Sequence, residues 1–462
     1  MNPSCFSKAN GIGRHKQDRN VLFRIAPRWI LKTLQKSFAL SVLVLAALAA
    51  NADEFERVPI SYSTTTPVNA ISRLQARLDK GDAAIAYDKE FGYLPSVLQA
   101  LNVPISSQTL VFSKTSLQRI RISPKTPRAL YFSDDMYIGY CQSGQVLEIS
   151  AVDPMLGTVF YSLDQQPTAK PKFERQVDAC ILCHGSSQTR GVPGHIVRSV
   201  YPDRTGEAVF ALGSQRVDQT TPIDRRWGGW YVTGTHGKQL HLGNLIVANR
   251  NDRETIANNP LGRNITNLKN FFDTSAYLTP HSDIVALMVL EHQVEMHNLI
   301  TRLNFQTRIA LHDQRQLNKE LGRAPNYWSE TTYRRIKAVA EPMLRYMFFS
   351  GEAKLTEKLQ GTSSFAAEFA RIGSRDGKGR GFREFDLQTR LFKYPCSYLI
   401  HSEPFERLPA EAKDYVYQRI HEILINRDYT RDFDHLTDAD RHAIWEILRA
   451  TKRDLPSYFA KK

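Results

Sequence analysis

Hydrophobic and polar positions follow two different periods along this chain. Between positions 109 and 161, short β-branched and aromatic runs alternate with Pro, Gly, Asp and Ser. Such punctuated runs predict a small antiparallel sheet. The predicted strands are at 110–112, 129–132, 137–140, 146–149 and 159–161. Two further strands are expected at 209–212 and 230–232, with a turn at 227–230.

From Ser282 onward, the apolar positions recur every three or four residues, which is typical of helices. Ser282 is predicted to cap a helix whose apolar positions extend to Leu303. In a second helix, at about 333–349, Pro342 should kink or split the backbone. Further helical patterns lie at 69–100, 410–425 and 438–451.

Two shorter features lie among the predicted C-terminal helices. Thr437 and Asp440 have the spacing of a capping box at the start of the last helix. The Gly- and Ser-rich interval 361–382 includes the run 373–381, which has three basic residues. The interval is expected to be an exposed loop, although its backbone amides and these basic side chains could also cradle an anion. Together, the patterns predict an α+β fold, with a β-rich segment followed by a mainly helical C-terminal half.

The chemistry of the chain is concentrated in Cys180-Ile181-Leu182-Cys183-His184. Two thiols three positions apart can bond both vinyl groups of one porphyrin, and the adjacent imidazole can ligate the iron. The pentad therefore predicts covalent attachment of one haem c. Cys180 and Cys183 are the expected attachment residues, and His184 is the expected proximal iron ligand.

Other uses of a Cys-x-x-Cys pair remain as alternatives: a redox-active dithiol, half of a zinc site, or a structural disulfide. A zinc ribbon needs a second ligand pair, which the isolated Cys5, Cys141 and Cys396 do not supply. A thioredoxin-like dithiol gives His184 no role. A disulfide between Cys141 and Cys396 is a further hypothesis for an oxidising compartment.

An N-terminal export signal is consistent with the haem hypothesis, because bacteria attach haem c outside the cytoplasm. Residues 38–50 form an apolar core after a basic leader and end at the small-x-small site Ala50-Asn51-Ala52. We expect cleavage after Ala52 and a periplasmic or otherwise exported protein. The longest later apolar run, 284–290, is too short to span a membrane.

Charge limits the range of partners. Eight basic residues and one acidic residue in the first 52 positions account for half of the net charge of +14. The mature chain is therefore only moderately basic and shows no nucleic-acid-binding module. A mild positive field is compatible with a generally basic surface or with docking to an acidic redox partner protein.

The sixth iron ligand would decide the chemistry of the haem. The first methionine after the motif is Met288, about a hundred residues on, so a Met ligand is not favoured. His195 is the preferred candidate, and His236 and His241 are the alternatives, although each could also be a hydrogen-bonded structural histidine. An open sixth position would permit catalysis or gas binding.

Two further groups of residues could lie near the haem. Met288, His292 and Met296 share one face of the helix after Ser282, with Glu291 and Glu295 beside them. This face could pack against the haem edge or form ordinary core. The arginines that follow the motif are candidate propionate partners; they are Arg190, Arg198, Arg225 and Arg226.

At the pentad, the chain resembles c-type cytochromes, and it is similar to large single-haem, cytochrome c domain-containing exported proteins of bacteria. The resemblance implies one covalent haem and electron transfer, with Cys180, Cys183 and His184 in the roles given above. Small cytochromes c are all-helical and have a Met ligand. This chain departs from both features, which puts the ordinary cytochrome fold and a high reduction potential in doubt.

The sequence thus predicts four parts: a signal peptide at 1–52, an N-terminal helical segment at 53–107, a β-rich haem-binding region at 108–280 and a helical region at 281–462. The predicted function is electron transfer to or from a redox partner protein. The alternatives are a haem-dependent oxidoreductase or peroxidase, whose additional regions bind the substrate, and a haem-based sensor.

Overall fold

The computed structural model describes residues 54–249, 251, 256, 258–428, 430–453 and 455–460. The expected signal peptide, its cleavage site and Cys5 lie outside these residues. From residue 53 onward, the chain forms one compact unit. The segments 53–107, 108–280 and 281–462 all contribute to the hydrophobic cores of this unit.

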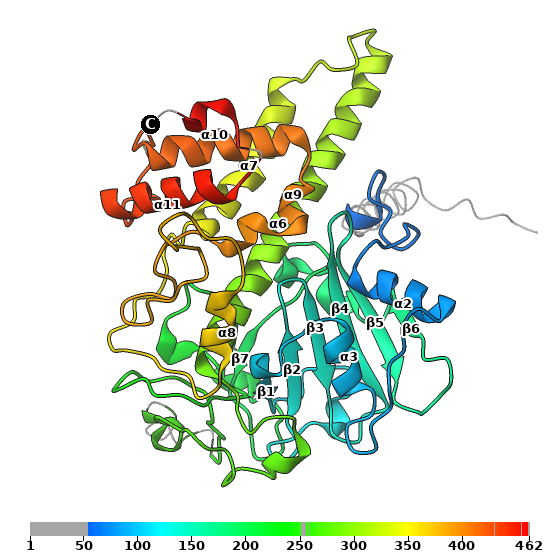
Figure 1. The fold of residues 1–462 in the computed structure, drawn as a ribbon, viewed down its shortest axis with the longest axis vertical. Coiled ribbons are helices and arrows are strands. Elements are labelled where there is room, and N and C mark those ends of the chain that lie inside the picture. The colour runs from blue at the N-terminus through cyan, green and yellow to red at the C-terminus, as the bar shows by residue number, and fades with distance from the viewer. Residues whose placement is uncertain are drawn as a thin grey trace, which may run out of the picture. The chain divides into compact units, whose positions relative to one another are not determined.

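An antiparallel sheet of seven strands organises the first half of the unit (Figure 1). Its spatial order is β6-β5-β4-β3-β2-β1-β9, so consecutive strands are neighbours and only β9 comes from a distant segment. The strands are β1 (Thr109–Val111), β2 (Arg128–Phe132), β3 (Met136–Tyr140), β4 (Val146–Asp153), β5 (Gly157–Asp164), β6 (Phe173–Gln176) and β9 (Trp230–Tyr231). A separate pair consists of β7 (Arg198–Val200) and β8 (Ser214–Arg216).

Alternation along the strands gives the sheet two different faces. Ala129 and Tyr131 of β2 belong to the core that α2 (Ala70–Lys80) and α3 (Leu94–Ala100) cover. Phe132 and Tyr137 belong to the other core, which they share with the beginning of α6. This second face also carries the polar side chains of Arg128, Glu148 and Ser150, and it is the face against which the Cys-x-x-Cys-His segment packs.

The second half is helical. Helix α6 is 37 residues long; it begins beside the sheet and is then joined by α7 and α10 (Figure 1). The helices after the sheet are α4 (Ile181–His184), α6 (Ile284–Glu320), α7 (Glu330–Met347), α8 (Phe365–Arg371), α9 (Glu403–Glu406), α10 (Ala410–Leu424) and α11 (Asp438–Thr451).

The predicted α+β class and order of elements are confirmed. The five expected strands between 109 and 161 are present, as are a strand at 230–231 and the Thr437–Asp440 capping box. The segment 69–100, which has a helical pattern, forms two helices, α2 and α3, rather than one. Among the described residues, no helix is both long enough and apolar enough to cross a bilayer.

Several local predictions are wrong. Residues 210–212 form a 3₁₀ turn rather than a strand, and the strand begins after Gly213, at Ser214. The cap of α6 is Asp283, whose carboxylate accepts from the amides of Val285 and Ala286; Ser282 instead donates to a strand carbonyl. Pro342 neither splits nor ends α7. The buried apolar face of α7 packs on α6 and α10, and this packing offsets the hydrogen bond that a proline removes.

Two further hypotheses lose their basis in this fold. Cys141 and Cys396 are both buried and free, so they form no disulfide. The Gly-rich interval contains α8 followed by a loop, and the basic side chains of that loop already pair with acids. Arg375 pairs with Glu384, while Lys378 and Arg380 pair with Glu446, so none of the three is left for an anion.

Candidate functional site

The Cys-x-x-Cys-His segment forms a single helical turn on the surface. Cys180 starts the turn, and its carbonyl accepts from the amide of His184 at 2.9 Å. Both thiols are free, Cys183 is exposed, and the intervening Leu182 is 83 % exposed. Burial raises the pKa of Cys180 to about 11, so this thiol is protonated at neutral pH. The turn therefore presents two unused thiols on one accessible stretch of backbone.

His184 has one engaged and one unused ring nitrogen. Its Nδ1 lies 2.8 Å from the carbonyl oxygen of Gly194, and because a carbonyl only accepts, Nδ1 must carry the hydrogen. No described residue makes a hydrogen bond to Nε2, which therefore holds a free lone pair. Burial against Phe160 lowers the pKa of His184 and favours the neutral ring. A neutral imidazole oriented through Nδ1 is the usual state of a metal-ligating histidine.

His195 lies next to His184 but is held by other partners. Its ring centroid is 5.7 Å from that of His184, and its Nε2 is 2.7 Å from the hydroxyl of Ser150. Asn298 on α6 binds both the amide and the carbonyl of His195. The carbonyl of the preceding Gly194 accepts the hydrogen of His184 Nδ1. By holding the backbone of His195, Asn298 therefore also helps to hold the carbonyl that orients His184.

Gly194 allows the loop that carries His195 to lie close to α6. A Cβ atom at this position would collide with Oδ1 of Asn298, so only glycine lets the loop approach the side chains of α6 this closely.

His236 and His241 belong to a different cluster. His236 donates from Nδ1 to the carbonyl of Gln239 and accepts at Nε2 from the amide of Asn264, so both nitrogens are engaged. His241 accepts at Nδ1 from the amide of Gly243, and its ring lies 4.6 Å from that of His236. No contact among the described residues joins this pair to His184. The structure therefore brings His195, but neither His236 nor His241, to the motif.

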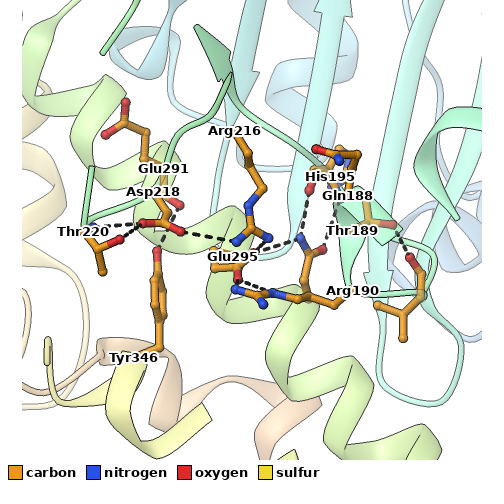
Figure 2. Close-up of polar contacts among 12 residues, drawn as sticks. Gln188, Thr189, Arg190, His195, Arg216, Asp218, Thr220, Glu291, Glu295 and Tyr346 are labelled. Carbon is orange, nitrogen blue, oxygen red and sulfur yellow. Dashed lines mark hydrogen bonds and ion pairs between the residues drawn. The ribbon is translucent and has the colours of Figure 1, made fainter. Parts of the chain in front are cut away.

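Behind the motif, polar side chains converge on α6 (Figure 2). Arg190 and Arg216 both pair with Glu295, at 2.5 and 3.1 Å. Arg226 pairs with Glu291 at 2.8 Å, and both side chains are almost wholly buried. Burial raises the pKa of Glu291 to about 7.

These ion pairs bear on the arginines that were expected near the propionates. Arg190 and Arg226 bind carboxylates of the protein itself, whereas Arg198 donates to Ser214 and Arg225 is exposed. The four-residue spacing of Glu291 and Glu295 was the sequence signal for these pairs. Their arginine partners could not be inferred, because the chain contains many arginines.

The Met-His-Glu face of α6 is part of the core. Met288, His292 and Met296 are at most 4 % exposed. His292 binds Gln219 through Nδ1 and Ser397 through Nε2, so neither nitrogen is left for a metal. Of the two interpretations of this face, the structure supports ordinary core.

A charged pair that the sequence did not indicate lies on the sheet near the motif. Arg128 of β2 extends over Gly139 of β3 and reaches Glu148 of β4 at 2.6 Å. The register Leu130–Gly139–Glu148 explains this bridge, since a side chain at the central position would collide with the guanidinium. The Glu148 charge raises and the Arg128 charge lowers the pKa values of both Cys180 and His184. The pair thus sets the local field at the motif.

The donor set fits a covalent haem. Two free thiols and one imidazole with an unused Nε2 are what thioether attachment and iron ligation require. The described residues contain no cluster of three or more His, Cys, Asp or Glu able to hold a metal ion. A porphyrin iron needs no such cluster, because the macrocycle supplies four nitrogens. Comparison with family models, curated proteins and solved structures finds no match.

Proposed function

We propose that this chain is an exported c-type haem protein that transfers electrons through one covalently bound haem. Cys180 and Cys183 would hold the macrocycle by thioether bonds, and His184 would ligate the iron through Nε2. The observation that carries the proposal is that two free thiols lie on the same helical turn as an imidazole whose Nδ1 is engaged and whose Nε2 is unused. The haem would supply a one-electron ferrous–ferric couple.

The residues around the motif would orient the ligand and tune the couple. The Gly194 carbonyl holds the hydrogen of Nδ1, which fixes the ring and increases the basicity of Nε2. The Arg128–Glu148 pair places one positive and one negative charge beside the site.

The sixth coordination position separates electron transfer from the alternatives. His195 Nε2 lies 2.7 Å from the Ser150 hydroxyl, so His195 would have to leave Ser150 to become the sixth ligand. A six-coordinate, low-spin haem would support electron transfer. An open sixth position would instead favour the alternatives, a haem oxidoreductase, a peroxidase or a sensor.

Haem staining tests the proposal directly. Exported wild-type protein should retain a haem stain on a denaturing gel, whereas Cys180→Ala and Cys183→Ala variants should lose at least one of the two thioether bonds. The pyridine haemochrome spectrum would then shift, because a vinyl group remains unsaturated. Cys141→Ala is the matched control and should stain like wild type. Colourless wild-type protein produced with an active haem-attachment system would rule out the proposed function.

A further inference from the structure

A cavity of about 670 Å³ lies between the β2–β3 turn, α3, α6 and α8. Its apolar wall comes from elements far apart in the sequence and is rich in aromatic rings. The residues of this wall are Leu98, Leu101, Val103, Phe132, Phe365 and Phe369. The volume is in the range of small-molecule sites, and the rings suit a flat apolar body.

Three acidic residues line the polar side of the cavity. Asp134 pairs with Arg383, and Glu368 accepts from Ser106 at 2.6 Å. Asp135 is the third, and no other described residue donates a hydrogen bond to its carboxyl. Its burial and the neighbouring Asp134 raise the pKa of Asp135. A ligand that donates a hydrogen bond would therefore find a proton acceptor beside the aromatic wall.

A continuous row of buried groups leads from this cavity to the motif. Gln293 lines the cavity and donates to the hydroxyl of Tyr137 at 3.0 Å. The Tyr137 ring lies 4.2 Å from the ring of His195, which in turn lies 5.7 Å from His184. Packed rings and hydrogen bonds carry electrons between sites more effectively than empty space does. The geometry therefore connects the cavity with the proposed iron ligand.

We propose that this cavity binds a small hydroxylated aromatic molecule that donates electrons to the haem. The inference rests on the proposed function and specifies the electron donor. The aromatic body would pack against the wall formed by Phe132, Phe365 and Leu101, while a hydroxyl group would donate to Asp135. Gln293, Tyr137 and His195 would form the route to His184.

The electrons and protons of this step balance. One electron passes from the ligand to the ferric iron, and the proton of the ligand hydroxyl passes to Asp135 and then to solvent. A redox partner protein reoxidises the iron, and a second transfer removes the second electron and proton. One hydroquinone thus becomes one quinone, while two electrons reach the partner and two protons reach water.

Binding can be measured without turnover. The probe is 2,3,5,6-tetramethylphenol, which has the ring and one hydroxyl, titrated into ferric haem-loaded protein by calorimetry. Wild type should bind it, and Asp135→Asn should weaken binding about tenfold, since the amide oxygen of asparagine accepts a weaker hydrogen bond than a carboxylate does. Leu101→Trp, which fills the cavity, should abolish binding. Asp82→Asn, an exposed change on another loop, should bind like wild type.

Electron transfer is tested by stopped-flow reduction with tetramethylhydroquinone. The wild-type rate should saturate with donor concentration, and both cavity variants should lose at least about tenfold in rate at low donor concentration. Reduction by dithionite should be unchanged in all variants, which also shows that they fold and carry haem. A wild type that fails to bind the phenol, or cavity variants that reduce as fast as wild type, would overturn the inference.

The two failures are distinguishable. Wild-type protein without covalent haem contradicts the proposed function itself. Haem-loaded protein in which the cavity variants behave like Asp82→Asn contradicts the cavity inference and leaves the haem proposal standing.

Discussion

The motif turn and the first half of α6 use histidines and charges in opposite ways. On the exposed turn at 180–184, two thiols and one ring nitrogen have no partner among the described residues. On α6, the buried His292 uses both nitrogens, and Glu291 and Glu295 are paired with arginines. Accessible groups without a partner can bind a ligand, whereas buried and paired groups hold the fold together.

This comparison predicts a large loss of stability when a buried glutamate of α6 loses its arginine partner. Arg226→Met leaves the Glu291 carboxylate buried without its ion pair, so the free energy of unfolding should fall by about 3–5 kcal/mol. Urea denaturation of the purified protein measures the effect. Exposed Arg225→Met, the neighbouring change, should alter stability by less than about 0.5 kcal/mol. Equal effects at the two positions would contradict the structural role assigned to Arg226.

The loss of stability should be intermediate at Gly194, where the loop after the motif contacts α6. Gly194→Ala introduces a Cβ that must displace the Asn298 amide and disturb its bonds to His195, which should cost about 1–3 kcal/mol. Denaturation again measures the change, and Gly377→Ala, where a Cβ meets nothing, is the control. In haem-loaded protein, Gly194→Ala should also perturb the absorption spectrum, because the Nδ1 hydrogen bond of His184 is disturbed. An unchanged stability would show that the loop does not need this close approach.

The sequence predicted local features well and long-range partners poorly. The strands at 129–161 and the Cys-x-x-Cys-His turn follow from short-range periodicity and spacing, and both lie where expected. The Arg226–Glu291 pair and the Arg128–Glu148 bridge join residues from different elements, so no local pattern could identify them. The strand predicted at 209–212 was wrong, because Gly213 at positive φ ends the run in a tight turn.

The histidines also show that long-range partners cannot be predicted from local sequence. Sequence spacing alone could not separate His195, which packs beside His184, from His236, which is satisfied by a loop of its own. The difference depends on Asn298 of α6, about a hundred positions away, which holds the His195 backbone. A histidine is thus identified as a candidate ligand by whether one of its ring nitrogens is free of hydrogen bonds, and that depends on tertiary contacts.

Measuring the free energy of unfolding as a function of pH tests the raised pKa of the Glu352 carboxyl. Burial raises the pKa of Glu352 to about 7, above its usual value of 4.5, so the folded state binds its proton more tightly. The stability derived from this group is present below pH 4.5 and is lost as the pH rises towards 7. Glu352→Gln should therefore gain stability relative to wild type as the pH rises from 5 to 8, by about 1–3 kcal/mol in all. Parallel stability profiles for the two proteins would show that the Glu352 pKa is not raised.

The smallest effect is expected on the motif turn itself. Leu182 is 83 % exposed although it is a large apolar residue between the two cysteines, so Leu182→Ser removes little buried area. Stability of the haem-free protein should change by less than about 0.5 kcal/mol in urea denaturation, and haem staining should be retained. Val97→Ser, a change of fully buried Val97 on α3, is the contrasting control and should destabilise the protein strongly. A comparable loss from Leu182→Ser would mean that the turn is packed like α6 and that its free donors serve the fold.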